Sequence, residues 1–216
     1  MMAKISTGVD FLDGFLGNYE GLINIYGPAG AGKTLLCKLC AIGAEKKVIF
    51  IDSEDGFSIE RLKQLTPDYR KVLEKLITFK PKNFYEQKQV IENLNEIVNN
   101  KVSVVIVDTL TKFYRVEIVK TDDTNMINSV LKKQINILSE ISKKVPVIIT
   151  NQVYSDFDIK DEIKIVGGEI VKNKSDLLLE IKKLRTGRKL IVHAPEQLKG
   201  KELIFRIEEK GIKEIK

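Results

Sequence analysis

The stretch Gly27-Pro28-Ala29-Gly30-Ala31-Gly32-Lys33-Thr34 fits the spacing G-x-x-x-x-G-K-[ST] of a phosphate-binding loop. Glycines in such a loop let backbone N–H groups surround phosphate oxygens at the N-terminus of a helix. We expect the whole stretch to bind ATP, with Lys33 reaching the β- and γ-phosphates and Thr34 serving as a Mg²⁺ ligand. An apolar run at 22–26 leads in and a helical pattern at 35–44 leads out, which disfavours a chance glycine-rich turn.

Short apolar runs alternate with helical patterns along the rest of the chain. Further buried strands are predicted at 48–52, 76–79, 102–108 and 146–150, and helices at 84–99 and around 127–141. This alternation predicts an α/β fold, a mostly parallel sheet with helices on both faces. After residue 176, apolar runs at 177–184, 189–194 and 203–207 are separated by turn residues, which predicts antiparallel β-hairpins at the C-terminal end.

Length and composition favour one folded domain over residues 1–216. Apolar residues make up 43% of the 216 positions and charged residues 31%, which excludes a disordered polymer, a fibre and a disulfide scaffold. No apolar run approaches the ~18 residues that cross a bilayer, and the start MMAKISTGVD has no apolar signal core, so we expect a cytoplasmic protein without a membrane partner.

The net charge of +6 is unevenly distributed. Residues 171–216 hold thirteen basic and seven acidic residues, so the whole positive excess lies there. A basic end on a neutral body indicates a polyanionic partner such as DNA. The predicted DNA-binding residues surround one hairpin tip: Lys182, Lys183, Arg185, Arg188 and Lys189. A solvated turn in a lysine-rich protein explains this cluster about equally well.

Carboxylates follow two of the predicted strands. A phosphate loop needs an acidic metal ligand at the end of a neighbouring strand, and Asp108 is expected to bind Mg²⁺ beside Thr34. Asp52, Glu54 and Asp55 end the strand at 48–52, where a base that polarises the attacking water must lie. Their spacing does not rank them, and an ordinary solvated acidic turn is the alternative.

A neutral amide closes a third strand in Thr150-Asn151-Gln152. Such an amide can hydrogen-bond a γ-phosphate or a water and so distinguish intact ATP from ADP. A turn-forming Asn-Gln pair is an equal alternative.

These elements, in this order, resemble the RecA/RadA recombinase family over nearly the whole chain. The resemblance rests on the phosphate loop and on its lead-in Ser6-Thr7-Gly8-Val9-Asp10, on Ile51-Asp52-Ser53-Glu54 with Ile59-Glu60-Arg61-Leu62, on Val107-Asp108-Thr109-Leu110-Thr111, and on Thr150-Asn151-Gln152-Val153. It implies a RecA-like P-loop NTPase core. It also implies roles for four residues: Glu54 as the catalytic base, Arg61 as an adenine contact, Gln152 as the γ-phosphate sensor and Pro195 in the ATP-capping segment.

Departures from the family pattern point to its short archaeal paralogues, the RadB family. The resemblance begins near residue 5, so no N-terminal helical domain is expected, and no Phe-x-x-Ala docking signature occurs in the chain. The segment 154–168, where the family has a DNA-binding loop, holds four carboxylates against two lysines. A negative loop is poorly suited to grip a phosphate backbone.

The resemblance therefore implies an ATP-binding, weakly ATP-hydrolysing, DNA-binding accessory protein in homologous recombination and DNA repair. Strand exchange is not expected. Single-stranded or branched DNA, a RadA-type recombinase and a branched-DNA nuclease are the partners that it implies. The alternatives are an active recombinase or DNA-dependent motor, and a KaiC-like signalling ATPase without a DNA role.

Overall fold

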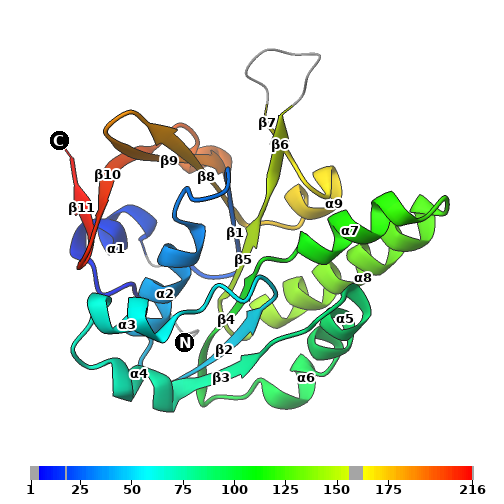
Figure 1. Cartoon of the computed structure of the whole chain (residues 1–216), viewed down its shortest axis with the longest axis horizontal. Helices are drawn as coiled ribbons and strands as arrows, with labels where there is room; N and C mark the ends of the chain where they lie inside the picture. Colours follow the sequence, from blue (N-terminus) through cyan, green and yellow to red (C-terminus); the bar gives the residue numbers. More distant parts are fainter. Residues whose placement is uncertain (1–4, 18, 156–162, 216) are drawn as a thin grey trace.

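The computed structural model describes residues 5–17, 19–155 and 163–215. In these ranges the chain forms a nine-stranded sheet and a separate two-stranded ribbon (Figure 1). Residues 156–162 lie outside the described part, and they carry most of the charges of the segment 154–168. The expectation that this segment grips DNA poorly is therefore not tested.

The large sheet has the order β11-β10-β9-β8-β1-β5-β4-β2-β3. Its parallel part runs from β8 to β3, and β9, β10 and β11 continue it as antiparallel hairpins. The strands are β1 Leu22–Tyr26, β2 Lys47–Asp52, β3 Leu76–Phe79, β4 Val102–Asp108, β5 Val147–Asn151, β6 Val153–Ser155, β7 Ile163–Ile165, β8 Leu177–Leu184, β9 Gly187–Ala194, β10 Glu202–Glu208 and β11 Gly211–Glu214. The predicted mostly parallel sheet with C-terminal hairpins is confirmed.

Helices cover both faces of this sheet (Figure 1). They are α1 Asp10–Leu16, α2 Lys33–Gly43, α3 Ile59–Leu65, α4 Tyr69–Lys75, α5 Phe84–Glu92, α6 Leu94–Ile97, α7 Lys112–Lys120, α8 Thr124–Ser142 and α9 Gly168–Lys172, with a 3₁₀ turn at Glu196–Leu198. Helices α1 and α2 pack in one core cluster, whereas α5, α7, α8 and α9 pack in the other.

Side-chain alternation along the central strands separates the two cores. In β4, Val104 and Ile106 point to the α1–α2 side, and Val105 and Val107 point to the α5–α8 side. Every residue of this strand is buried. Burial on both faces is the physical reason that residues 104–107 are all apolar rather than alternating with polar residues.

Two expectations about single elements were wrong. The helix expected over 84–99 is interrupted at Asn93, between α5 and α6, where the Glu96 N–H bonds to the Asn93 carbonyl three residues back instead of four. Strand β3 was expected to be buried, but it forms one edge of the sheet and its residues are half-buried or exposed. An edge strand has a neighbour on one side only, so part of its surface stays in water.

The segment that leads into the phosphate loop has a structural task in this fold. The Asp13 carboxylate accepts hydrogen bonds from the Ser6 hydroxyl at 2.9 Å and from the Thr7 N–H at 2.6 Å. These bonds hold the lead-in against α1, and the Ser6 backbone lies against Gly43 at the end of α2. A Cβ atom on Gly43 would lie 2.4 Å from the Ser6 carbonyl oxygen, so only glycine fits at this contact.

No helix in the described ranges is both long and apolar enough to cross a bilayer.

We expect Gly43→Ala to lower the melting temperature by about 2–4 °C or more, at about 2–4 °C for each kcal/mol in a chain of this size. Alanine is the better helix former by ~1 kcal/mol, but here its methyl group collides with the backbone of Ser6. Gly14→Ala in α1 is the matched control, because a Cβ atom there meets nothing within 4 Å. It should raise the melting temperature. A stabilising Gly43→Ala would contradict the close approach.

Candidate nucleotide-binding site

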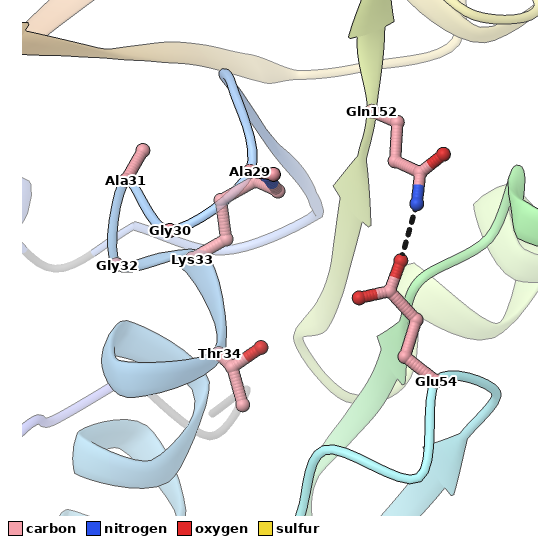
Figure 2. Close-up of a pocket in the computed structure, with 8 residues that line it drawn as sticks. All are labelled: Ala29, Gly30, Ala31, Gly32, Lys33, Thr34, Glu54 and Gln152. Carbon is pink, nitrogen blue, oxygen red and sulfur yellow. Dashed lines mark hydrogen bonds between the residues drawn. The ribbon is translucent and has the colours of Figure 1, made fainter.

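Strands β1, β2, β4 and β5 end at one edge of the sheet, and the candidate site lies there. Its pocket has two walls (Figure 2). The phosphate loop and Thr34 at the start of α2 form one wall, and Glu54 after β2 and Gln152 after β5 form the other. The residues that line the pocket are Ala29, Gly30, Ala31, Gly32, Lys33, Thr34, Glu54 and Gln152. Three motifs that are distant in sequence thus meet in one cavity.

The glycines of the phosphate loop are required by close packing. Gly27 lies so near β8 that a Cβ atom would be 2.5 Å from the Ile181 carbonyl oxygen. Gly32 has a φ of 112°, in the region that side chains disfavour, and its Cβ would lie 2.9 Å from Cδ1 of Ile207. The loop is therefore pressed against the C-terminal hairpins, with no room for side chains on that side.

Lys33 is turned back onto its own loop. Its Nζ donates to the carbonyl oxygens of Gly27 at 2.7 Å and Pro28 at 3.0 Å. Burial lowers the pKa of Lys33, whereas the nearby carboxylates of Glu54 and Asp108 act to raise it. A buried ammonium beside a concave loop is suited to a phosphate, which would replace both carbonyls as the acceptor.

Asp108 has the chemistry of a metal ligand. Its side chain is fully buried; Oδ1 accepts a 2.5 Å hydrogen bond from the Thr150 hydroxyl, whereas Oδ2 has no hydrogen-bond partner. Burial raises the pKa of Asp108, whereas the nearby side chains of Thr150 and Thr34 act to lower it. An unpartnered carboxylate oxygen beside the Thr34 side chain fits the hard-oxygen ligand set that Mg²⁺ prefers. The residues present thus fit the metal.

Hydrogen bonding separates the three carboxylates that spacing left unranked. Asp52 is buried, and its two oxygens accept the backbone N–H groups of Gly56 and Phe57. Asp55 is exposed and paired with Lys80. Glu54 faces the pocket, where its Oε1 accepts a 2.5 Å hydrogen bond from Nε2 of Gln152 (Figure 2). The geometry thus favours Glu54 as the base.

Gln152 connects Glu54 to α7. Its Oε1 accepts a 3.2 Å hydrogen bond from Nη1 of Arg115, while its Nε2 donates to Glu54. The amide therefore has one end in the pocket and the other bound to an exposed helix. This placement is suited to a group that distinguishes ligands in the pocket.

A bonded network behind Glu54 was not found from the sequence. The Ser53 N–H donates to the Asp108 carbonyl at 2.9 Å, its hydroxyl donates to Gln87 at 2.7 Å, and its carbonyl accepts from Nζ of Lys112 at 2.6 Å. Gln87 is fully buried and also donates to Gln134 of α8. One signal was available, because Gln87 is a polar residue at an apolar position of its helix.

Two residues named by resemblance are not among those that line this pocket. Arg61 of α3 donates to the carbonyl oxygens of Glu208 at 2.9 Å and Glu209 at 2.7 Å, in the turn between β10 and β11. Strand β8 runs parallel to β1, and β9 runs antiparallel to β8. Pro195, which follows β9, therefore lies at the opposite end of the strands from the phosphate loop. Pro195 therefore does not reach the phosphate-loop pocket of the chain to which it belongs.

The five hairpin cations do not form one surface. Lys182 and Lys189 are cross-strand partners and lie beside Glu180 at 3.7 Å and Glu202 at 2.8 Å. Lys183 and Arg188 are the next pair and therefore point to the other face. There, Arg188 reaches the phosphate loop. Arg185 is exposed in the turn, without a hydrogen bond or ion pair to any described residue.

A phosphate loop between a parallel strand and a helix, facing an acidic strand end, defines a P-loop nucleotide-binding protein of RecA-like fold. The model of the Rad51 family matches residues 1–215, and the chain belongs to that family.

Among its relatives, the DNA repair and recombination protein RadB of Methanocaldococcus jannaschii is 37% identical over 207 residues, covering 91% of this chain and 95% of the relative. RadB of Pyrococcus furiosus is 35% identical over 223 residues, covering 98% and 96%. A crystal structure of the RadB recombinase superposes with a TM-score of 0.84 at 31% identity, covering 98% of this chain and 100% of the other. The inferred family and the RecA-like fold are confirmed.

We expect Asp108→Asn to raise the melting temperature at pH 7 in metal-free buffer by about 2 °C or more, at about 2–4 °C for each kcal/mol. The folded-state pKa of Asp108 lies above its unfolded value, so its stabilising contribution is present below the unfolded pKa and lost as the pH rises through the folded pKa. At pH 7, above the unfolded pKa, burial of this carboxyl group therefore costs stability. The gain from Asp108→Asn should shrink as the pH falls through the folded-state pKa of Asp108.

Asp52→Asn is the matched control. Both oxygens of Asp52 accept backbone N–H groups, so an amide nitrogen there would face a donor and lower the melting temperature. Thermal denaturation of both variants across pH provides the comparison. Equal losses of stability in the two variants would contradict the view that Asp108 is a buried, under-partnered carboxylate.

Proposed function

We propose that this protein binds Mg²⁺-ATP, hydrolyses it slowly, and acts on DNA as an accessory in homologous recombination and repair. One observation carries the ATP part. The phosphate loop, the unpartnered oxygen of Asp108 and the hydrogen-bonded pair of Glu54 and Gln152 meet at one sheet edge. A phosphate-binding loop, a metal ligand and a candidate base are the parts that ATP hydrolysis requires.

The residues of the pocket divide the work. Backbone N–H groups of the loop and the Lys33 ammonium bind the phosphates, and Thr34 and Asp108 hold Mg²⁺, which neutralises charge on the phosphate oxygens when bound. Glu54 orients the attacking water and accepts its proton at a carboxylate oxygen. Gln152 senses the γ-phosphate through the amide that also bonds to Glu54.

The DNA part is supported by the family and by the charge distribution. The relatives are named DNA repair and recombination proteins, and the positive excess of this chain lies in residues 171–216. We propose Arg185 as the principal DNA-phosphate contact of the hairpin, because Lys182 and Lys189 lie beside carboxylates. A RadA-type recombinase and a branched-DNA nuclease are the proposed protein partners.

Glu54→Gln should leave ATP binding intact and reduce turnover by ~10²- to 10⁴-fold, the usual cost of a lost general base. The amide keeps the size of the side chain but cannot accept the proton. Phosphate release under single-turnover conditions, with ATP affinity measured in parallel, provides the test.

Asp55→Asn is the matched control, since Asp55 is exposed and paired with Lys80. Its turnover should remain within about twofold of wild type. If Asp55→Asn removes turnover and Glu54→Gln does not, the base has been assigned to the wrong carboxylate.

Arg185→Ala should flatten the slope of log affinity against log salt by about 0.9 on duplex DNA, the contribution of one neutralised phosphate. Because phosphate contacts carry no base information, affinity should fall equally for all sequences. Arg70→Ala is the matched control. It removes an exposed arginine of α4, the helix that leads into edge strand β3. It should leave the slope unchanged.

The same titrations separate the alternatives. A wild-type slope in Arg185→Ala rejects this contact. Strong stimulation of ATP turnover by DNA would favour a motor or active recombinase over an accessory protein. Complete absence of DNA binding would favour a signalling ATPase.

A further inference from the structure

One face of the β8–β9 hairpin packs against α2 and the phosphate loop. Ile181 and Leu190 belong to the same core cluster as α2, so they mark the face that points toward this helix. Lys183 is two residues beyond Ile181, and Arg188 is two residues before Leu190. Side chains two residues apart on a strand share a face, so both cations extend this face beyond the core.

Both cations lie against the loop. Arg188 donates from Nε to the Ala31 carbonyl at 3.2 Å and from Nη2 to the Gly30 carbonyl at 3.3 Å. Nζ of Lys183 is 3.4 Å from the point where a Cβ atom of Gly30 would lie. The charge of Lys183 is also close enough to act on Lys33, lowering the pKa of that ammonium.

We infer that Lys183 and Arg188 belong to the nucleotide site of their own chain, with Lys183 as a contact to the nucleotide phosphates and Arg188 as a positioning residue that holds the loop. This inference rests on the proposed binding of ATP. It takes the two cations out of the set that the sequence assigned to DNA.

Arg188 can affect phosphate binding without touching the phosphate, because it orients peptide units of the loop. A trans peptide unit is planar, and its N–H points away from its C=O. Binding the Ala31 carbonyl from the hairpin side therefore directs the Gly32 N–H away from the hairpin, and binding the Gly30 carbonyl fixes the preceding unit. Inward-facing N–H groups are the part of such a loop that binds phosphate oxygens.

Lys183 is free to contribute a charge. Unlike Lys182 and Lys189, it has no ion pair with a carboxylate in the described part of the chain. The Lys183 ammonium beside Gly30 adds a second positive charge to the Lys33 side of a pocket whose opposite wall carries Glu54. A triphosphate is the ligand that offsets both charges.

The experiment measures Mg²⁺-ATP affinity of the full chain by calorimetry, with duplex DNA affinity measured in parallel. Lys183→Ala should weaken ATP binding about tenfold, the effect of one charge-assisted hydrogen bond. Arg188→Ala should weaken it about three- to tenfold, and Arg188→Lys should recover part of the loss because an ammonium can still bind one carbonyl. Neither alanine variant should change DNA affinity by more than about twofold.

Lys182→Ala and Lys189→Ala are matched controls, since they remove the same charge from the opposite face of the same two strands. Their ATP affinity should stay within about twofold of wild type. Lys183 is exposed, so its alanine variant should keep the wild-type melting temperature without nucleotide, which separates lost binding from lost folding.

Three outcomes overturn the inference. The first is wild-type ATP affinity in Lys183→Ala and Arg188→Ala while Lys33→Ala loses at least tenfold, which leaves the ATP site itself standing. The second is a loss of DNA affinity without a loss of ATP affinity, which returns both cations to DNA. The third is wild-type ATP affinity in Lys33→Ala, which removes the proposed function together with this inference.

Discussion

The parallel alignment of the central strands is the constraint on which the site depends. Tyr26 of β1 pairs with Asn151 of β5, and Asp52 of β2 pairs with Asp108 of β4, so these strand ends are level. Strands β1, β4 and β5 are buried along their whole length. A slip by one residue would turn every side chain to the wrong core, which makes the register, and hence the convergence of the site, costly to disturb.

Most of the fold was predictable because its signals are local. A continuous apolar run identifies a buried parallel strand wherever it occurs, and the phosphate loop identifies the strand and helix beside it. The break at Asn93 was not predictable by the same means. Leu94 and Val98 continue the apolar spacing of α5 whether the helix is continuous or interrupted, so the spacing does not reveal the hydrogen bonds that end it.

The motifs of the site were predictable from the sequence, but the orientations and hydrogen bonds of its side chains were not. Asp52, Glu54 and Asp55 all carry a carboxylate and lie within four positions of one another. Only the loop geometry shows that Glu54 is the one that faces the pocket. The hairpin cations were treated as one charge cluster. Adjacent strand residues such as Lys182 and Lys183 point to opposite faces, however, and what each face meets depends on long-range packing.

The bonds of Arg61 link parts of the chain that are far apart in the sheet. Helix α3 follows β2, near one edge, whereas the turn that holds Glu208 and Glu209 joins β10 to β11 at the other. Strand β11 is an edge strand with a single neighbour, β10, so separating it breaks the backbone bonds of one strand pair only. The guanidinium bonds add to the cost of this separation. A ligand that drew Arg61 away would therefore loosen the last strand, and amide exchange in β10 and β11 would speed up relative to exchange in the central strands.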